Sequence, residues 1–300
     1  MALQPASLTG TAPRSGVTGS ARIWQTLRLS PTRRAQLGLQ MPLGLLILIT
    51  LACFFAPPLL NIHPAMDGNI LDANLPLGSP GHLLGTDQVG NDLLARTLWG
   101  GRISLGVGAG ATAMGFIVGA NVGLLAGYFG GAIDSIVMRI LDVFLAFPAL
   151  ILALCVAAYL GPSERDEILA IAFFTVPHYA RLARAATLRL REREFILAGR
   201  VMGCSPWRVT LRHIYPNIVP VLITVAPLTI ATSMVVEASL SFLGLGVSPP
   251  IPSWGNMIAS AYGLMNLYPV YIIVPGVCLF VTVFCFNMVG EQIRTRLGGR

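Results

Sequence analysis

The chain is 300 residues long and carries 20 basic residues against 13 acidic ones, a formal net charge of +7. Hydrophobic residues make up 54% of it, charged residues only 11%, and the mean hydropathy is +0.72. So few charges exclude a soluble globular protein and indicate a protein of the lipid bilayer. Every basic residue is an arginine, and the absence of lysine excludes a Walker A nucleotide site, whose lysine must reach the phosphates.

The first hundred residues divide into a tail, one membrane span and an external segment. Residues 1–34 are rich in Ser, Thr, Gly and Pro, carry five arginines and no acidic residue, and predict a flexible tail. They lack the apolar region of a signal peptide. Residues 35–60 form an uncharged apolar run, long enough to cross the hydrocarbon, which needs about 20 residues. Residues 61–102 follow with four aspartates and predict an external segment.

Five further spans are expected in residues 103–290, so the predicted fold class is an all-α membrane protein with six transmembrane helices. The five windows are 103–126, 137–160, 168–186, 216–236 and 268–290. Arg181 and Arg184 in the window 168–186 are expected to extend their side chains to the interface. Residues 291–300 form a C-terminal tail. Six spans place both termini on the same side of the membrane.

The arginines indicate which side is cytoplasmic. Residues 181–213 hold eight arginines against Glu192 and Glu194, and the N-terminal tail holds five against no acid. By the positive-inside rule both regions lie in the cytoplasm. The external segment and the acidic turn at residues 164–167 then face outward. Both termini are therefore predicted to be cytoplasmic.

The longest internal cytoplasmic loop, residues 188–217, is predicted to form two short helices joined by a turn. The residues before Gly203 favour a helix, and Gly203 suits the left-handed position that often ends one. Ser205 is a typical N-cap, and Pro206 suits the first turn of a second helix, expected to run until Pro216. A folded helix-Gly-helix element on the cytoplasmic face indicates a docking partner.

This loop resembles the EAA loop of ABC importer permeases, in which a Gly follows the EAA triplet and a Pro closes the second helix. Gly203 and Pro216 occupy those positions. The likeness is greatest to the C-type permease subunit of the dipeptide/oligopeptide/nickel importer family. The residues that meet that pattern are Glu194, Phe195, Ile196, Arg200, Gly203, Ser205, Trp207, Arg208, Arg212, His213, Pro216 and Asn217. Leu197, Gly199 and Tyr215 depart from it without changing the Gly-to-Pro spacing.

Three further blocks resemble the same family in the same order, at residues 82–105, 127–148 and 237–255. The resemblance implies an ATP-driven importer in which two nonidentical permeases form the path and each cytoplasmic loop lies in a groove of an ATPase. The positions that it implies for ATPase coupling are Glu194, Ala198, Gly199, Arg200, Gly203, Cys204, Ser205, Pro206, Trp207 and Arg208. The alternative for this loop is a basic surface held by lipid phosphates.

The resemblance further implies uptake of dipeptides or oligopeptides across the bacterial cytoplasmic (inner) membrane, with no catalysis by this chain. The implied partners are a second, B-type permease, two ABC ATPase subunits that bind ATP and Mg, an extracytoplasmic peptide-binding protein and membrane lipids. No cofactor, metal or nucleic acid is expected on this chain. Nickel uptake is the alternative within the family. A secondary transporter and an intramembrane enzyme are the alternatives from other classes, but the sequence shows neither internal repeats nor a nucleophile-base motif.

The second predicted span carries a glycine at every fourth position. These glycines are Gly115, Gly119, Gly123 and Gly127. A run of GxxxG steps exposes backbone along one stripe of a helix, so another helix is expected to pack closely against it. That helix could belong to this chain or to the partner permease.

Four polar residues inside the predicted spans are candidates for the substrate path. They are Asp142, His178, Glu237 and Asn287. The alternative for each is structural pairing, for example of Asp142 with Arg139 or another arginine. No metal site is predicted, because the five cysteines show no CxxC spacing and His82 has no second histidine at ligand spacing.

Overall fold

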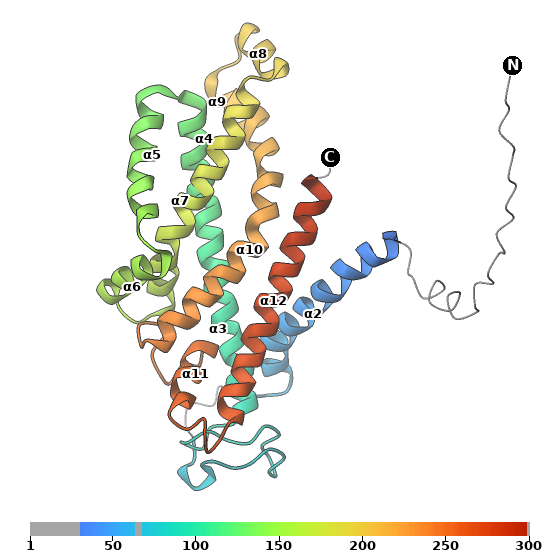
Figure 1. Ribbon diagram of the computed structural model, residues 1–300, viewed down its shortest axis with the longest axis vertical. Helices are drawn as coiled ribbons and strands as arrows, with labels where there is room; N and C mark the ends of the chain where they lie inside the picture. The colour runs from blue at the N-terminus through green and yellow to red at the C-terminus, as the bar shows by residue number, and fades with distance from the viewer. Residues whose placement is uncertain (1–30, 64–67, 299–300) are drawn as a thin grey trace, which may run out of the picture. The chain divides into compact units, whose positions relative to one another are not determined.

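The computed structural model describes residues 31–63 and 68–298, so most of the predicted tail 1–34 lies outside the described residues. The chain divides into two units, residues 1–38 and residues 39–300, and the packing below is that of the second. Its described residues form helices and no strand, which confirms the all-α prediction (Figure 1). The helices are α2 (Pro31–Leu59), α3 (Leu93–Met114), α4 (Ala120–Phe129), α5 (Gly131–Ala146), α6 (Ala149–Leu160), α7 (Glu164–Arg191), α8 (Glu194–Val201), α9 (Pro206–Arg208), α10 (Tyr215–Phe242), α11 (Trp254–Tyr262) and α12 (Val270–Gly298), with a 3-10 turn at Ile70–Asp72 and π-helical turns at Gly115–Gly119 and Val209–Ile214.

Within residues 31–63 and 68–298, length and hydropathy select four helices as candidate membrane spans, or five if α5 and α6 together form one. The four are Leu39–Leu59, Leu93–Phe129, Pro206–Phe242 and Val270–Arg296. The sequence predicts six, and the difference includes the window 168–186, which lies inside α7. With eight charged residues α7 is too polar to be selected, yet it packs against α3, α4 and α5. Its place in the bundle therefore comes from packing and not from hydropathy.

The second span begins about three turns earlier than the predicted window 103–126. Asp92 caps its start by accepting a hydrogen bond from the backbone of Ala95 at 2.7 Å, and α3, the π-helical turn and α4 then run on to Phe129. The Arg102 guanidinium lies 4.3 Å from the centroid of the Trp99 ring. This cation-π contact helps to accommodate a charge that sequence reasoning assigned to the external segment.

The third predicted span, residues 137–160, is two helices. α5 ends at Ala146 and α6 begins at Ala149, and the two axes are bent by 93°. Phe147 between them has extended backbone dihedrals, because a residue that precedes a proline is disfavoured in the helical region and Pro148 follows it. The prediction of one continuous helix here is wrong. The Phe147–Pro148 pair is the local sequence signal for the break.

The sequence predicted that the second helix of the loop 188–217 ends at Pro216. In the structure this helix continues past Pro216. α9, the π-helical turn Val209–Ile214 and α10 form one helix, Pro206–Phe242. A proline lacks the N–H that an α-helix interior needs, and the wider π-helical turn just before Pro216 accommodates that loss. The loop 188–217 therefore continues directly into a candidate membrane span.

The two ends of residues 39–300 differ in structure (Figure 1). α8 and α9 lie at one end, and the segment of residues 68–92 lies at the other, close to α11. Near α8, the buried side chains of Ile196, Ile214 and Tyr179 belong to one core cluster. Near α11, the buried indole of Trp254 donates to the Thr97 carbonyl at 2.9 Å. Each end thus has its own anchored core.

Candidate functional site

α8 ends in a glycine turn with a complete set of capping bonds. Gly203 has a φ of +79°, a left-handed conformation that disfavours any side chain. Its N–H donates to the Arg200 carbonyl at 3.0 Å, and the N–H of Cys204 donates to the Gly199 carbonyl at 3.1 Å. These two bonds are those of a Schellman motif. The predicted glycine turn is confirmed, and it gives a defined angle between α8 and α9.

The second helix of the loop starts as its sequence indicates. The Ser205 hydroxyl accepts from the Arg208 backbone at 3.4 Å, and Pro206 is the first helical residue. Cys204, just before the cap, is partly buried against the core cluster that holds Ile196 and Ile214. The turn is therefore fixed to the bundle on its inner side.

Aromatic and arginine side chains tie the loop to the end of α4. The Trp207 and Phe129 rings meet edge to face with centroids 6.3 Å apart. The Arg200 guanidinium lies 4.9 Å from the centroid of the Tyr128 ring. Such contacts add fractions of a kcal/mol to about 1 kcal/mol each. They hold α8 and α9 against the helix that carries the glycine stripe.

The outer surface of the loop is apolar although it lies beyond the core. Its exposed hydrophobic side chains are Phe195, Leu197, Val201, Met202, Trp207 and Leu211. Val201 is 89% exposed and Met202 is 78% exposed. Glu194, Ala198, Arg200 and Arg208 are exposed around them, whereas Gly199 is buried. An apolar patch rimmed by charges at the end of a bundle is typical of a protein contact surface.

The glycine stripe packs against α7 of the same chain. A Cβ atom at Gly115 would lie 2.6 Å from the Thr175 hydroxyl, and one at Gly127 would lie 3.0 Å from the Arg184 carbonyl. At Gly119 and Gly123 the added atom would overlap α7 backbone directly. The structure thus decides between the two partners that the sequence left open: the close contact is internal.

Two of the four predicted path residues lie on exposed surface of α5 and α7. The Asp142 carboxylate accepts a hydrogen bond from Arg181 at 2.6 Å, and both side chains are 58% exposed. His178 is exposed one turn before Arg181. Of the arginines that the sequence left open as partners of Asp142, the structure selects Arg181 on α7 and not Arg139.

Comparison with known proteins gives three kinds of match: a family profile, relatives of similar sequence and a solved structure. The sequence profile of the family described as binding-protein-dependent transport system inner membrane component matches residues 119–298. The glutathione transport system permease protein GsiD of Pectobacterium atrosepticum is 39% identical over 254 residues, 85% of this chain and 84% of that protein. The dipeptide transport system permease protein DppC of Alkalihalophilus pseudofirmus is 39% identical over 216 residues, 72% of this chain and 71% of that protein.

The chain belongs to this permease family. It is a membrane permease subunit of an ABC importer and does not itself hydrolyse ATP, which is the task of separate ATPase subunits in this family. A solved structure of the MetNI methionine ABC transporter in an inward-facing conformation has the same fold. It aligns with a TM-score of 0.54 at 21% identity and covers 68% of this chain and 95% of that one.

Glu237, the third of the four path candidates, is buried in the permease. Ser241 Oγ lies 3.1 Å from Glu237 Oε1 and 3.4 Å from Glu167 Oε1, and both carboxyl groups are fully buried. Glu167 was missed, because α7 and α10 meet only in the folded chain. Asn287 lies on exposed surface of α12 and donates to the Val283 carbonyl at 2.9 Å. The four predicted path residues therefore do not form one site.

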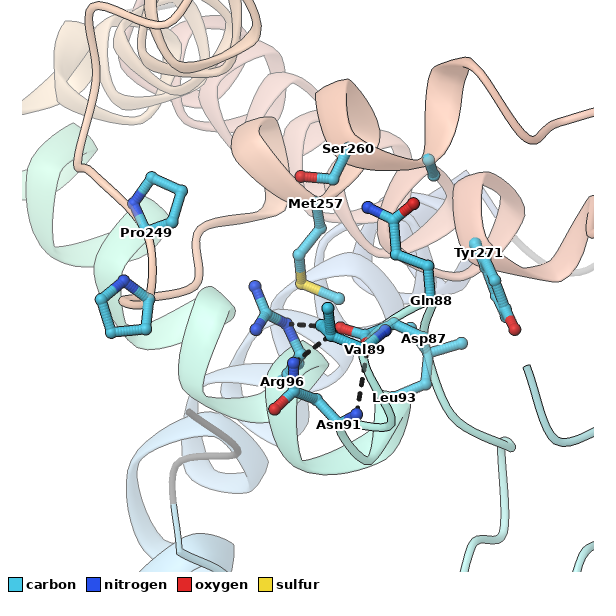
Figure 2. A pocket seen from close by; sticks show the side chains of 12 residues that line it. Asp87, Gln88, Val89, Asn91, Leu93, Arg96, Pro249, Met257, Ser260 and Tyr271 are labelled. Carbon is cyan, nitrogen blue, oxygen red and sulfur yellow. Dashed lines mark hydrogen bonds and ion pairs between the residues drawn. The ribbon is translucent and has the colours of Figure 1, made fainter. Parts of the chain in front are cut away.

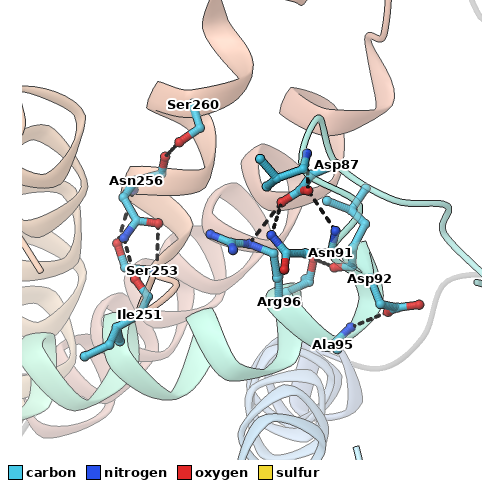
Figure 3. A network of polar contacts seen from close by, with 12 residues as sticks. Asp87, Asn91, Asp92, Ala95, Arg96, Ile251, Ser253, Asn256 and Ser260 are labelled. Carbon is cyan, nitrogen blue, oxygen red and sulfur yellow. Dashed lines mark hydrogen bonds and ion pairs between the residues drawn. The ribbon is translucent and has the colours of Figure 1, made fainter. Parts of the chain in front are cut away.

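The end of the permease that holds residues 68–92 contains a cavity of about 300 Å³ between residues 87–96, the Pro249–Pro250 pair and α11 (Figure 2). Asp87 accepts from the backbone N–H groups of Val89 and Asn91 at 3.0 and 2.9 Å, and its other oxygen lies 3.5 Å from Arg96 Nε. Figure 3 shows the neighbouring cap of α11, in which Asn256 accepts from the Ser253 backbone at 3.0 Å. The Asp87 carboxylate is thus occupied in shaping the external segment.

Proposed function

We propose that this permease is the C-type subunit of an importer of dipeptides or oligopeptides in a bacterial inner membrane. The two relatives above are named for glutathione and dipeptide transport, and glutathione is itself a short peptide. Each match extends over more than two thirds of both chains. Shared length and identity of this kind support a shared class of cargo.

The proposed mechanism rests on one observation, the continuous helix from the cytoplasmic loop into the membrane. α8 is the docking element, the Gly203 turn sets its angle, and the helix Pro206–Phe242 starts three residues later. A rigid displacement of α8 by an ATPase would move the start of this helix directly, since no flexible segment intervenes. The coupling residues predicted from the resemblance lie on or beside these two elements.

The exposed apolar side chains of the loop supply the contact for the ATPase. Val201 and Met202 project at the junction of α8 with the glycine turn, and Trp207 is exposed on the first turn of the next helix. Burying such side chains in a groove stabilises a complex by roughly 25 cal/mol per Å² of apolar surface. Lipid phosphates alone would not select for this apolar surface, which favours docking over the basic-surface alternative.

The orientation follows from the arginine distribution and the position of the loop. α8 and α9 lie at the end opposite to residues 68–92 (Figure 1), so the loop faces the cytoplasm and that segment faces outward. The partners at the cytoplasmic face are two ABC ATPases that bind ATP and Mg. A second, B-type permease completes the path, and a peptide-binding protein delivers the cargo from outside.

The test of the coupling mechanism is Gly203→Val, with Gly276→Val as the matched control. Valine at a φ of +79° is strained by about 1–2 kcal/mol or more, so the angle between α8 and α9 should change. Gly276 lies within α12, outside the loop, and a Cβ atom there would meet nothing within 4 Å. In proteoliposomes with the complete importer, Gly203→Val should lower peptide uptake at least tenfold, and Gly276→Val should leave it unchanged.

Membrane insertion is measured in parallel, because a misfolded variant would also lose uptake. The expected pattern for Gly203→Val is normal insertion, weakened ATPase association and lost uptake. Normal uptake by a stably inserted Gly203→Val variant would contradict the proposed role of the turn.

A further inference from the structure

α5 and α7 present two polar stripes on their exposed surfaces. On α7 the exposed residues follow a spacing of three to four, which places them on one face: His178, Arg181, Ala185 and Arg189. On α5 the corresponding residues are Ser135, Arg139, Asp142 and Ala146. The hydrogen bond between Asp142 and Arg181 joins the two stripes. Together they bring five polar or charged side chains besides Ser135 and the small Ala146 and Ala185 to one surface of a protein with few charges.

The rest of the exposed surface of α5 is strictly apolar. Its large side chains are Ile133, Ile136, Ile140 and Val143. A helix in a membrane bundle that exposes both kinds of stripe has two different surroundings, because an exposed charge in hydrocarbon is costly. The apolar stripe suits lipid or another apolar helix surface. The polar stripe needs water or polar ligands.

Two ion pairs connect α5 to α7, and they differ in geometry. Arg184 binds both oxygens of Asp134, through Nε at 2.5 Å and Nη2 at 2.6 Å, and the side chains are 32% and 14% exposed. Arg181 reaches Asp142 through one nitrogen only, and both side chains are 58% exposed. A bidentate, half-buried pair is suited to holding helices together. A single exposed contact is weak and is readily exchanged for other partners.

We propose that Asp142 and Arg181 bind the two ends of a zwitterionic peptide during its passage. The ammonium group of the peptide would replace Arg181 beside Asp142, and the peptide carboxylate would replace Asp142 beside Arg181. This inference rests on the proposed function, since it assigns the recognition of a peptide cargo to a wall of the path. The Asp134–Arg184 pair stays closed and keeps the two helices in place.

The charges around the pair match this ligand class. The guanidinium fork of Arg181 has the geometry to bind a carboxylate through two nitrogens, of which the resting pair uses one. Arg139 and Arg189 add positive charge on the same surface and favour the carboxylate end. Asp142 is the only acidic residue in the two stripes, so the ammonium end has one defined position.

The test compares three cargoes in proteoliposomes that contain the complete importer: a free dipeptide, its N-acetyl form and its C-amide form. All are supplied at concentrations that saturate the binding protein. The same binding protein serves every permease variant, so its own preference cancels in the ratio of variant to wild type. Asp142→Asn should lower uptake of the free and amide peptides about tenfold and spare the N-acetyl form. Arg181→Gln should lower uptake of the free and N-acetyl peptides and spare the amide.

A charge-reversed double variant, Asp142→Arg with Arg181→Asp, separates recognition from structure. It retains an ion pair between the helices but reverses its direction. If the pair recognises the peptide, the double variant should not regain uptake of the free dipeptide. Asp134→Asn serves as the comparison, and its uptake should show the wild-type ratio among the three cargoes.

Three outcomes would overturn the inference. Equal losses for all cargoes, or rescue by the reversed pair, would show a purely structural pair. Loss of the partner permease in the single variants, restored in the double variant, would show that the pair is an interface between permeases. If the wild-type importer takes up no peptide at all while its ATPase responds to another cargo, the proposed function itself fails, and the inference with it.

Discussion

The two sides of α7 make contacts of opposite kinds. One side carries Ala180, Ala183 and Thr187, which are fully buried, and it meets the glycine stripe with no room for a side chain between the backbones. The other side carries Arg181 and Arg184, which reach α5 through ion pairs. The first contact depends on shape and the second on charge.

This difference indicates which contact is permanent. Backbone surfaces in van der Waals contact have no alternative partner of equal fit, so separating α4 from α7 would leave unfilled space. In an exposed ion pair such as Asp142–Arg181, each side chain can replace its partner by water or a ligand at little cost in free energy. We therefore expect α3, α4 and α7 to move as one body, and the α5 side of α7 to respond to cargo.

The largest effect is expected from a side chain in the shape-dependent contact. Gly123→Leu would push α7 backbone away at Ala180 and should destabilise the permease by about 3 kcal/mol or more. The yield of assembled importer after purification in mild detergent measures it. Ile117→Leu is the control, because Ile117 lies in the same span, Leu93–Phe129, and is 59% exposed. Equal yields for the two variants would mean that the glycine spacing is incidental.

A smaller effect is expected from the closed ion pair on the other side. Asp134→Asn removes the bidentate contact with Arg184 and should lower the stability of the complex by about 1–2 kcal/mol. Asp142→Asn at the exposed pair should cost less, about 0–1 kcal/mol. Thermal denaturation of the purified complex compares them. A larger loss for Asp142→Asn would reverse the assignment of structural and exchangeable pairs.

The smallest effect on stability is expected from a cysteine substitution whose only purpose is to measure whether the surface of α7 is exposed to water. In a background that keeps Cys285 as its one native cysteine, Ala185→Cys adds a thiol on the exposed side of α7, whereas Cys285 is buried. A water-soluble maleimide should label position 185 and not Cys285, because only the former faces the proposed aqueous path. Failure to label position 185 in an assembled importer would place that surface against lipid or protein.

Local features of the sequence determined the parts of this protein that depend on a few neighbouring residues. Gly203, Ser205 and Pro206 predicted the loop turn and the start of its second helix correctly, since caps involve bonds within one or two turns. The break at Phe147–Pro148 also had a local signal, although the apolar run around it suggested a continuous span.

Only the tertiary structure decided which helices meet. The glycine stripe predicts that another helix packs closely against it. That this helix is α7 depends on contacts between residues about 60 positions apart. The window 168–186 predicted a span within α7, but the partners of Arg181 and Arg184 lie on α5, outside that window. The burial of Glu237 beside Glu167 has the same origin. Composition and caps are properties of a segment, whereas burial and pairing are properties of the surfaces that segments present to each other.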